Sequence, residues 1–75
     1  MPVINIELTR EGVTREQKRA LIQQVSDVVT NILNKDPNLT HVVIREIDTD
    51  NWGYGGEQVS VLREQGITAD KKTVK

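Results

Sequence analysis

The residue with the most distinctive chemistry is Pro2, which follows Met1 and opens directly into an apolar segment. If Met1 is removed, Pro2 carries a free secondary amine at the end of a rigid element. An α-amino group titrates near pH ~8 in model peptides, and burial in an apolar pocket or a neighbouring cation lowers its pKa. A neutral amine at pH 7 can act as a general base. On this feature alone, the plainer interpretation is that Pro2 merely starts a strand.

The side chains on which most enzyme mechanisms depend are scarce. The chain has no cysteine, which excludes a thiol nucleophile, a disulfide and a thiolate metal site. Its one histidine, His41, cannot build a histidine-rich metal site, and no serine and carboxylate arrangement around it indicates a triad. The stretch Gly53-Tyr54-Gly55-Gly56 is too short and wrongly placed for a dinucleotide-binding loop. We expect no metal and no cofactor.

Composition narrows the possible partners. Eleven acidic and ten basic residues leave a net charge of −1 with no basic block, which argues against nucleic acid or an anionic membrane. The apolar runs are short, so we expect neither a signal peptide nor a membrane helix. We expect the protein to be cytoplasmic. A domain of 75 residues is marginal without disulfides or a metal, so partner chains are the expected support.

The pattern along the chain predicts the elements that carry Pro2 and His41. Residues 3–8 alternate as a half-buried strand, with Ile4, Ile6 and Leu8 on one face. Thr14 and Gln17 form a capping-box pattern before an amphipathic helix of about five turns, from residue 15 to about 34. Residues 35–38, which include a proline, end this helix, and residues 40–47 form a second strand.

Strand, long helix, strand predicts an α/β fold built on a βαβ unit, in which the two strands are parallel. Parallel strands are normally buried on both faces, which two strands under one helix cannot achieve. The second face of the sheet and its edges therefore need other copies of the chain.

The C-terminal third contains both aromatic residues in the stretch Trp52–Gly56, where three glycines favour an irregular hairpin. Residues 57–63 fit a short strand or a helical turn equally well. We expect one domain over residues 1–63 and a polar tail over residues 64–75.

Three features occur in order along the chain: Pro2 at the head of a strand, Glu11-Gly12 before a capped helix with Glu16-Gln17-Lys18, and the later Trp52–Gly56 segment. On these features, the chain resembles the 4-oxalocrotonate tautomerase family over residues 2–63. The resemblance implies that the processed N-terminal proline shuttles a proton between the oxygen and carbon ends of an enol. It also implies a βαβ monomer with a C-terminal hairpin, a four-stranded sheet in each dimer, and a hexamer made of three dimers.

The same resemblance places Val13 and His41 where the family's best-known members hold a dicarboxylate with two arginines, and it makes Trp52 the wall beside the proline. His41, helped by Arg10, is then the candidate to orient a carboxylate or polarise a carbonyl. Alternatives stay open: Arg10 and Arg45 as solvated surface charges, His41 and Trp52 as subunit contacts, and Tyr54 as a packing residue.

The leading hypothesis is a keto–enol tautomerase, a cofactor-independent isomerase for a small 2-oxo or 2-hydroxydienoate acid. Without both arginines it should prefer a monoacid such as phenylpyruvate to a dicarboxylate. One alternative is a decarboxylase or hydratase of the same superfamily that uses a protonated proline. Another is an oligomeric binding protein without catalytic activity.

Overall fold

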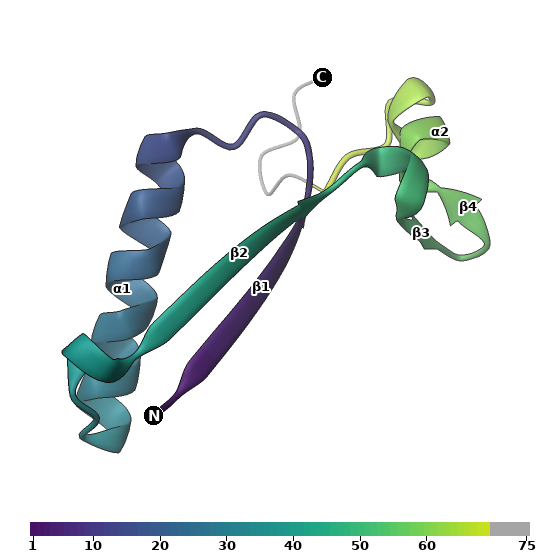
Figure 1. Cartoon of the computed structure of the whole chain (residues 1–75). Helices are drawn as coiled ribbons and strands as arrows, with labels where there is room; N and C mark the ends of the chain where they lie inside the picture. The colour runs from purple at the N-terminus through teal and green to yellow at the C-terminus, as the bar shows by residue number, and fades with distance from the viewer. Residues whose placement is uncertain (70–75) are drawn as a thin grey trace.

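A two-stranded parallel sheet and one long helix form the main body of the protein (Figure 1). The computed structural model describes residues 1–69. Strand β1 (Val3–Thr9) leads into helix α1 (Arg15–Leu33), and a 3-10 turn at Pro37–Leu39 precedes strand β2 (His41–Ile47). A second 3-10 turn at Thr49–Asn51 leads to strands β3 (Gly53–Tyr54) and β4 (Glu57–Gln58) and to helix α2 (Val59–Glu64).

The register of the sheet confirms the expected βαβ unit. Strand β1 pairs with β2 in parallel, from Val3 opposite His41 to Thr9 opposite Ile47. Ile4, Ile6 and Leu8 are half-buried, whereas Asn5 and Glu7 are exposed, so the alternation in the sequence separates the two faces of the sheet as predicted. The sheet therefore has one covered face and one open face.

Both ends of α1 are capped by the local sequence. The backbone N–H of Gln17 donates to the Thr14 hydroxyl at 3.1 Å, and the backbone N–H of Thr14 donates to the Gln17 side chain at 2.9 Å, which confirms the capping box. The helix ends at Leu33 because Asn34 adopts a left-handed conformation at φ 54°. This stop comes before Pro37, which instead starts the 3-10 turn.

The sequence left open whether residues 57–63 form a short strand or a helical turn, and the structure contains both. Residues 57–58 pair with Gly53–Tyr54 as a small antiparallel hairpin, and α2 follows at once. A Cβ at Gly53 would lie 2.9 Å from the carbonyl oxygen of Glu57, so only glycine fits this closely paired position. The predicted tail is described only as far as residue 69, and its residues 70–75 lie outside the described part.

The chain buries very little of itself. Among the described residues, Val59 alone is fully buried, with 1% of its surface exposed. The accessible surface is 6059 Å², whereas a compact monomer of this mass exposes roughly 4,700 Å². The radius of gyration is 15.4 Å, against roughly 11 Å for a compact chain of 75 residues.

Apolar side chains on α1 and on the open face of the sheet account for much of this exposure. The most exposed members include Ile32 at 74%, Leu33 at 57%, Val3 at 55% and Val28 at 54%. This excess of apolar surface agrees with the expectation that further chains cover the molecule. Within residues 1–69, no helix has both the length and the apolar character required to cross a membrane.

Candidate functional site

Pro2 and His41 lie side by side at one end of the sheet. The backbone N–H of His41 donates to the carbonyl oxygen of Pro2 at 3.0 Å, which continues the ladder one residue beyond the paired strands. This hydrogen bond fixes the backbone of Pro2 at the start of β1. With Met1 attached, the Pro2 nitrogen is part of a peptide bond, and Met1 is 78% exposed at the tip of the strand.

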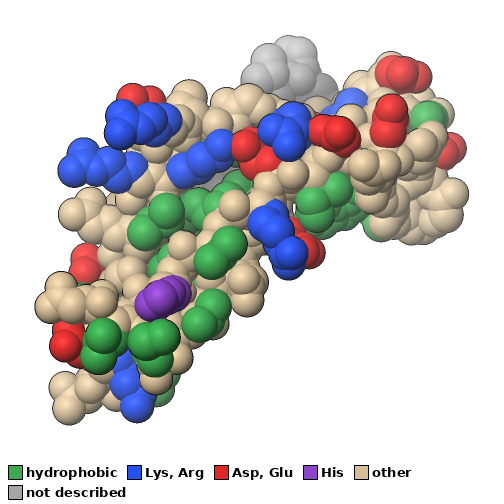
Figure 2. Space-filling view, viewed as in Figure 1, with side chains coloured by type: hydrophobic (Ala, Val, Ile, Leu, Met, Phe, Trp, Pro, Cys, Tyr) green, Lys and Arg blue, Asp and Glu red, His purple; other side chains and the backbone are tan. Residues whose placement is uncertain are grey.

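The His41 side chain is exposed on the open face of the sheet. Figure 2 shows the histidine in purple on a surface where hydrophobic side chains gather. Its register partner Val3 and its neighbour on the same face, Val43, are both large exposed hydrophobic residues. An imidazole in this position has hydrogen-bonding capacity beside two apolar side chains, next to the strand end that carries Pro2.

Arg10 lies at the opposite end of the sheet from Pro2. Its Nε donates to the carboxylate of Asp48 at 2.8 Å, and its Nη2 donates to the backbone carbonyl of Glu46 at 3.3 Å. The Glu46 carboxylate also forms an ion pair with Lys18 of α1. Arg10 is thus engaged by groups at the end of β2, and its predicted role toward a substrate remains a prediction.

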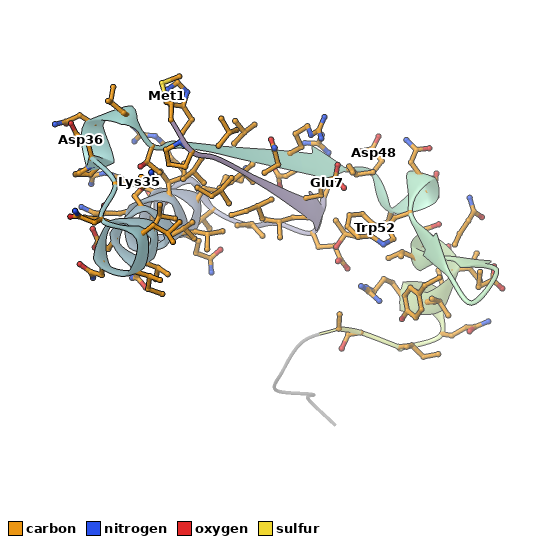
Figure 3. All side chains as sticks on the ribbon, turned by 90° about the horizontal axis from the view of Figure 1, so that it is seen from below. Met1, Glu7, Lys35, Asp36, Asp48 and Trp52 are labelled. Carbon is orange, nitrogen blue, oxygen red and sulfur yellow. The ribbon has the colours of Figure 1, made fainter. Side chains whose placement is uncertain are left out.

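Trp52 also lies at this far end, beyond the ends of both strands (Figure 3). Strand β1 has seven residues, which separates its two ends by about 20 Å. One copy of the chain therefore does not bring Trp52 against its own Pro2. The pairing of Pro2 with Trp52 that the sequence analysis expects stays a prediction, and it would need a second copy.

The half-buried Trp52 forms part of a cavity of about 240 Å³. The cavity lies where the hairpin and α2 meet the end of β1, and its other lining residues are Glu7, Leu8, Thr9, Tyr54, Val59, Arg63 and Ala69. In Figure 3, Trp52 lies close to the Glu7 end of β1. Among these residues, the exposed carboxylate of Glu7 is paired with Arg45 on the open face at 3.0 Å.

The sequence analysis did not identify Arg63, which is the cation of this cavity. Its guanidinium donates from Nε and Nη2 to the two carboxylate oxygens of Glu11, and from Nη1 to the carbonyl of Ile67 at 2.9 Å. The hydrogen bond from Arg63, together with one from Thr9, lowers the pKa of Glu11, and the same contact with Glu11 raises the pKa of Arg63. Glu11 and Arg63 are 52 positions apart, so no local spacing indicates this pair.

A larger concavity of about 400 Å³ runs along the first half of α1, lined by Arg15, Lys18, Arg19 and Ile22. All four residues belong to one helix and lie at none of the positions expected to do chemistry. Within residues 1–69, no group of three or more potential metal ligands is close enough together to hold an ion.

Comparison with known proteins gives one consistent result. The model of a family described as "Tautomerase enzyme" matches residues 2–62. A curated protein of Dickeya dadantii (strain 3937), called probable tautomerase K2, is 49% identical over 65 residues, which cover 87% of this chain and 97% of that protein.

Two solved structures have the same fold. The crystal structure of DmpI from Helicobacter pylori superposes with a TM-score of 0.79 at 48% identity, over 84% of this chain and 97% of that one. A 4-oxalocrotonate tautomerase isozyme from Methylibium petroleiphilum superposes with a TM-score of 0.80 at 25% identity, over 85% and 98%.

Proposed function

Because this chain belongs to the tautomerase family, we propose that it catalyses keto–enol tautomerisation with Pro2, freed of Met1, as the general base. The observation that carries the proposal is the position of Pro2: it immediately precedes β1, is held by its hydrogen bond with His41, and lies beside the exposed apolar Val3 at the edge of the open face. In that position, an apolar environment from a neighbouring copy would keep the amine neutral.

The reaction transfers one proton within the substrate. The neutral Pro2 nitrogen takes the proton from the enol hydroxyl, and the electron pair of that O–H bond forms the carbonyl. The C=C electron pair then takes the proton back from the protonated proline to form a C–H bond. The amine ends as it began, so this step needs neither a metal nor a cofactor.

We propose that each site is shared between two copies. In β1, the carbonyl of Pro2 and the N–H of Arg10 both bond to β2, so in a parallel ladder the even-numbered positions face β2. The backbone groups of Val3, Asn5 and Glu7 then face the free edge. Antiparallel pairing of two such edges brings Pro2 of one copy to the end of the sheet where Trp52 of the other copy lies.

This pairing also yields the four-stranded sheet that the family resemblance implies, and the apolar row on α1 provides the surface for joining dimers into a hexamer. Trp52 of the second copy would exclude water around the amine and strengthen the electrostatic interactions in the site. His41 would donate a hydrogen bond to the oxygen that becomes a carbonyl. Arg10 would assist with a substrate carboxylate only after leaving Asp48.

The substrate class proposed is a small 2-hydroxydienoate or an enol of a 2-oxo acid, with a monoacid such as phenylenolpyruvate turned over better than a dicarboxylate. The exposed groups near Pro2 support this preference, because Val3, His41 and Val43 offer one polar side chain and no guanidinium.

The test combines intact mass with kinetics. The mass of the purified protein should show that Met1 is absent, and the same sample should ketonise phenylenolpyruvate. Pro2→Ala should lower kcat by about 10²–10⁴, the range that a general base contributes. A Pro2→Ala variant with the full rate, or an active protein that retains Met1, rejects the proline mechanism.

A further inference from the structure

The cavity beside Trp52 contains one side chain suited to binding an anion, and it is the residue that the sequence analysis missed. Arg63 is only 19% exposed, and it shares the cavity with the indole of Trp52, the phenol of Tyr54 and the buried Val59. We propose that this cavity binds the carboxylate of the substrate through Arg63, with the unsaturated part of the molecule against Trp52. This inference rests on the proposed function, since it assigns a role in the same shared site.

The hydrogen bonds of Arg63 leave it able to take a ligand. A guanidinium has five N–H groups. Two of them go to Glu11 through Nε and Nη2, and one goes from Nη1 to the carbonyl of Ile67. One N–H on Nη1 and one on Nη2 remain, and a carboxylate would take these in competition with the Tyr54 hydroxyl, whose interaction also raises the pKa of Arg63.

Glu11 acts as a positioning residue for Arg63. It grips the guanidinium through both carboxylate oxygens and itself accepts a hydrogen bond from the Thr9 hydroxyl. Arg63 is therefore held in one orientation before a ligand arrives, which reduces the conformational entropy that binding costs.

The charges around the cavity favour a ligand with one carboxylate. Glu7 lines the cavity, but its charge is balanced by Arg45 at 3.0 Å. Arg63 is partly neutralised by Glu11, and Arg10 is engaged by Asp48 and Glu46, so a second ligand carboxylate would find no ready partner among these groups. A volume of about 240 Å³ lies below the range of about 300–1,000 Å³ typical of drug-sized ligands and suits a small acid.

The same residues also fit a purely structural role, in which Arg63 and Glu11 only tie α2 to the loop after β1. Two variants separate these roles. Arg63→Gln and Glu11→Gln both break the ion pair, but only Arg63→Gln removes the cation. A structural tie predicts equal losses of ligand binding, whereas the proposal predicts a much larger loss in Arg63→Gln than in Glu11→Gln.

Binding can be measured without turnover because Trp52 is the only tryptophan in the chain. Titration of the fluorescence of the mature oligomer with trans-cinnamate, a planar unsaturated monocarboxylate, should show saturable quenching. Arg63→Gln should weaken this binding about tenfold or more, as expected for the loss of hydrogen bonds to a charged group. Glu11→Gln should weaken binding less than Arg63→Gln does, since it loosens the hold on the guanidinium but leaves the cation in place.

Two controls make the result specific. Cinnamamide, which has the same shape but no charge, should bind weakly and equally to the unmodified protein and to Arg63→Gln. Arg63→Lys keeps a positive charge without the planar fork and should bind cinnamate with intermediate affinity. If circular dichroism shows that Arg63→Gln does not fold, Arg63→Lys still tests the site.

Unchanged cinnamate affinity in Arg63→Gln, or equal losses in Arg63→Gln and Glu11→Gln, overturns the proposal. The Pro2→Ala variant separates this outcome from a failure of the proposed function. If Pro2→Ala keeps the full rate while cinnamate binding still depends on Arg63, the anion site stands and the proline mechanism falls. If Pro2→Ala is inactive while cinnamate binding does not depend on Arg63, the proline mechanism stands and the anion site falls.

Discussion

The backbone N–H of His41 lies 3.0 Å from the carbonyl oxygen of Pro2. His41, the first residue of β2, therefore directly fixes Pro2, which precedes β1. This contact joins the proposed base and the proposed hydrogen-bond donor through the backbone of the sheet. Their relative position therefore depends on a regular β ladder, which is more rigid than a loop.

Substitution of His41 should reduce catalysis without disturbing this contact, because the contact uses only the backbone. We expect His41→Ala to lower kcat/KM for phenylenolpyruvate about tenfold, the effect of losing one hydrogen bond to developing charge. Val43→Ala, on the same face but without a donor, is the matched control and should change kcat/KM much less. Equal effects of both variants would mean that His41 only packs against a neighbouring subunit.

A site shared between copies predicts that two inactive variants restore each other. Pro2→Ala lacks the base, and Trp52→Ala lacks the wall. In a mixed dimer, one of the two sites receives Pro2 from one chain and Trp52 from the other, and is complete. Mixing the two proteins under conditions of subunit exchange should therefore raise the rate well above that of either alone.

No recovery after verified subunit exchange, shown by native mass spectrometry, would mean that Pro2 and Trp52 do not meet across an interface. The Trp52→Ala protein mixed with itself is the control for any gain that comes from exchange conditions alone.

The free edge of β1 predicts the effect of a proline at residue 5. The backbone N–H of Asn5 faces away from β2, so Asn5→Pro removes a donor from the open edge and spares the ladder within the chain. We expect this variant to lose both oligomeric mass and activity, as measured by light scattering and kinetics. Asn5→Ala retains the N–H and should remain assembled, and an assembled, active Asn5→Pro protein would place the interface elsewhere.

The lowered pKa of Glu11 predicts a pH-dependent stability. A carboxyl whose pKa is depressed in the folded state stabilises the protein above its unfolded pKa, which is near 4.5, and this contribution is lost as the pH falls through the folded pKa. Between pH 6 and pH 3, the Tm should therefore fall more steeply for the unmodified protein than for Glu11→Gln. Glu64→Gln is the exposed control, and identical slopes in Glu11→Gln and the unmodified protein would exclude this contribution.

The elements of this fold could be predicted because their signals are local. The alternation of Ile4, Ile6 and Leu8 predicts a strand, and the pair Thr14 and Gln17 predicts the start of the helix, since each depends on neighbours within a few residues. The structure of residues 57–63 could not be predicted because a strand of two residues passes directly into the six-residue helix α2. Each element is too short to show the hydrophobic period of a strand or a helix.

The site was only partly predictable because it depends on contacts between distant parts of the chain. Pro2 and Trp52 stand out by residue type, and the predicted parallel strands imply that they lie at opposite ends of the sheet, about 20 Å apart within one copy. The sequence does not say which surface of a second copy would bring them together. The pair Glu11 and Arg63 joins the loop after β1 to helix α2 across 52 positions of sequence, so its identification needed the structure. The roles assigned to His41 and Arg10 stay predictions for kinetics to decide.

A molecule in which Val59 is the one deeply enclosed side chain of the described residues should depend on neighbouring copies for most of its stability. Dissociation and unfolding should then merge into a single event, and the melting temperature should climb with protein concentration. Dilution would switch off this catalyst by dismantling the protomer itself, so its working lifetime in any compartment depends on how much of it has been made.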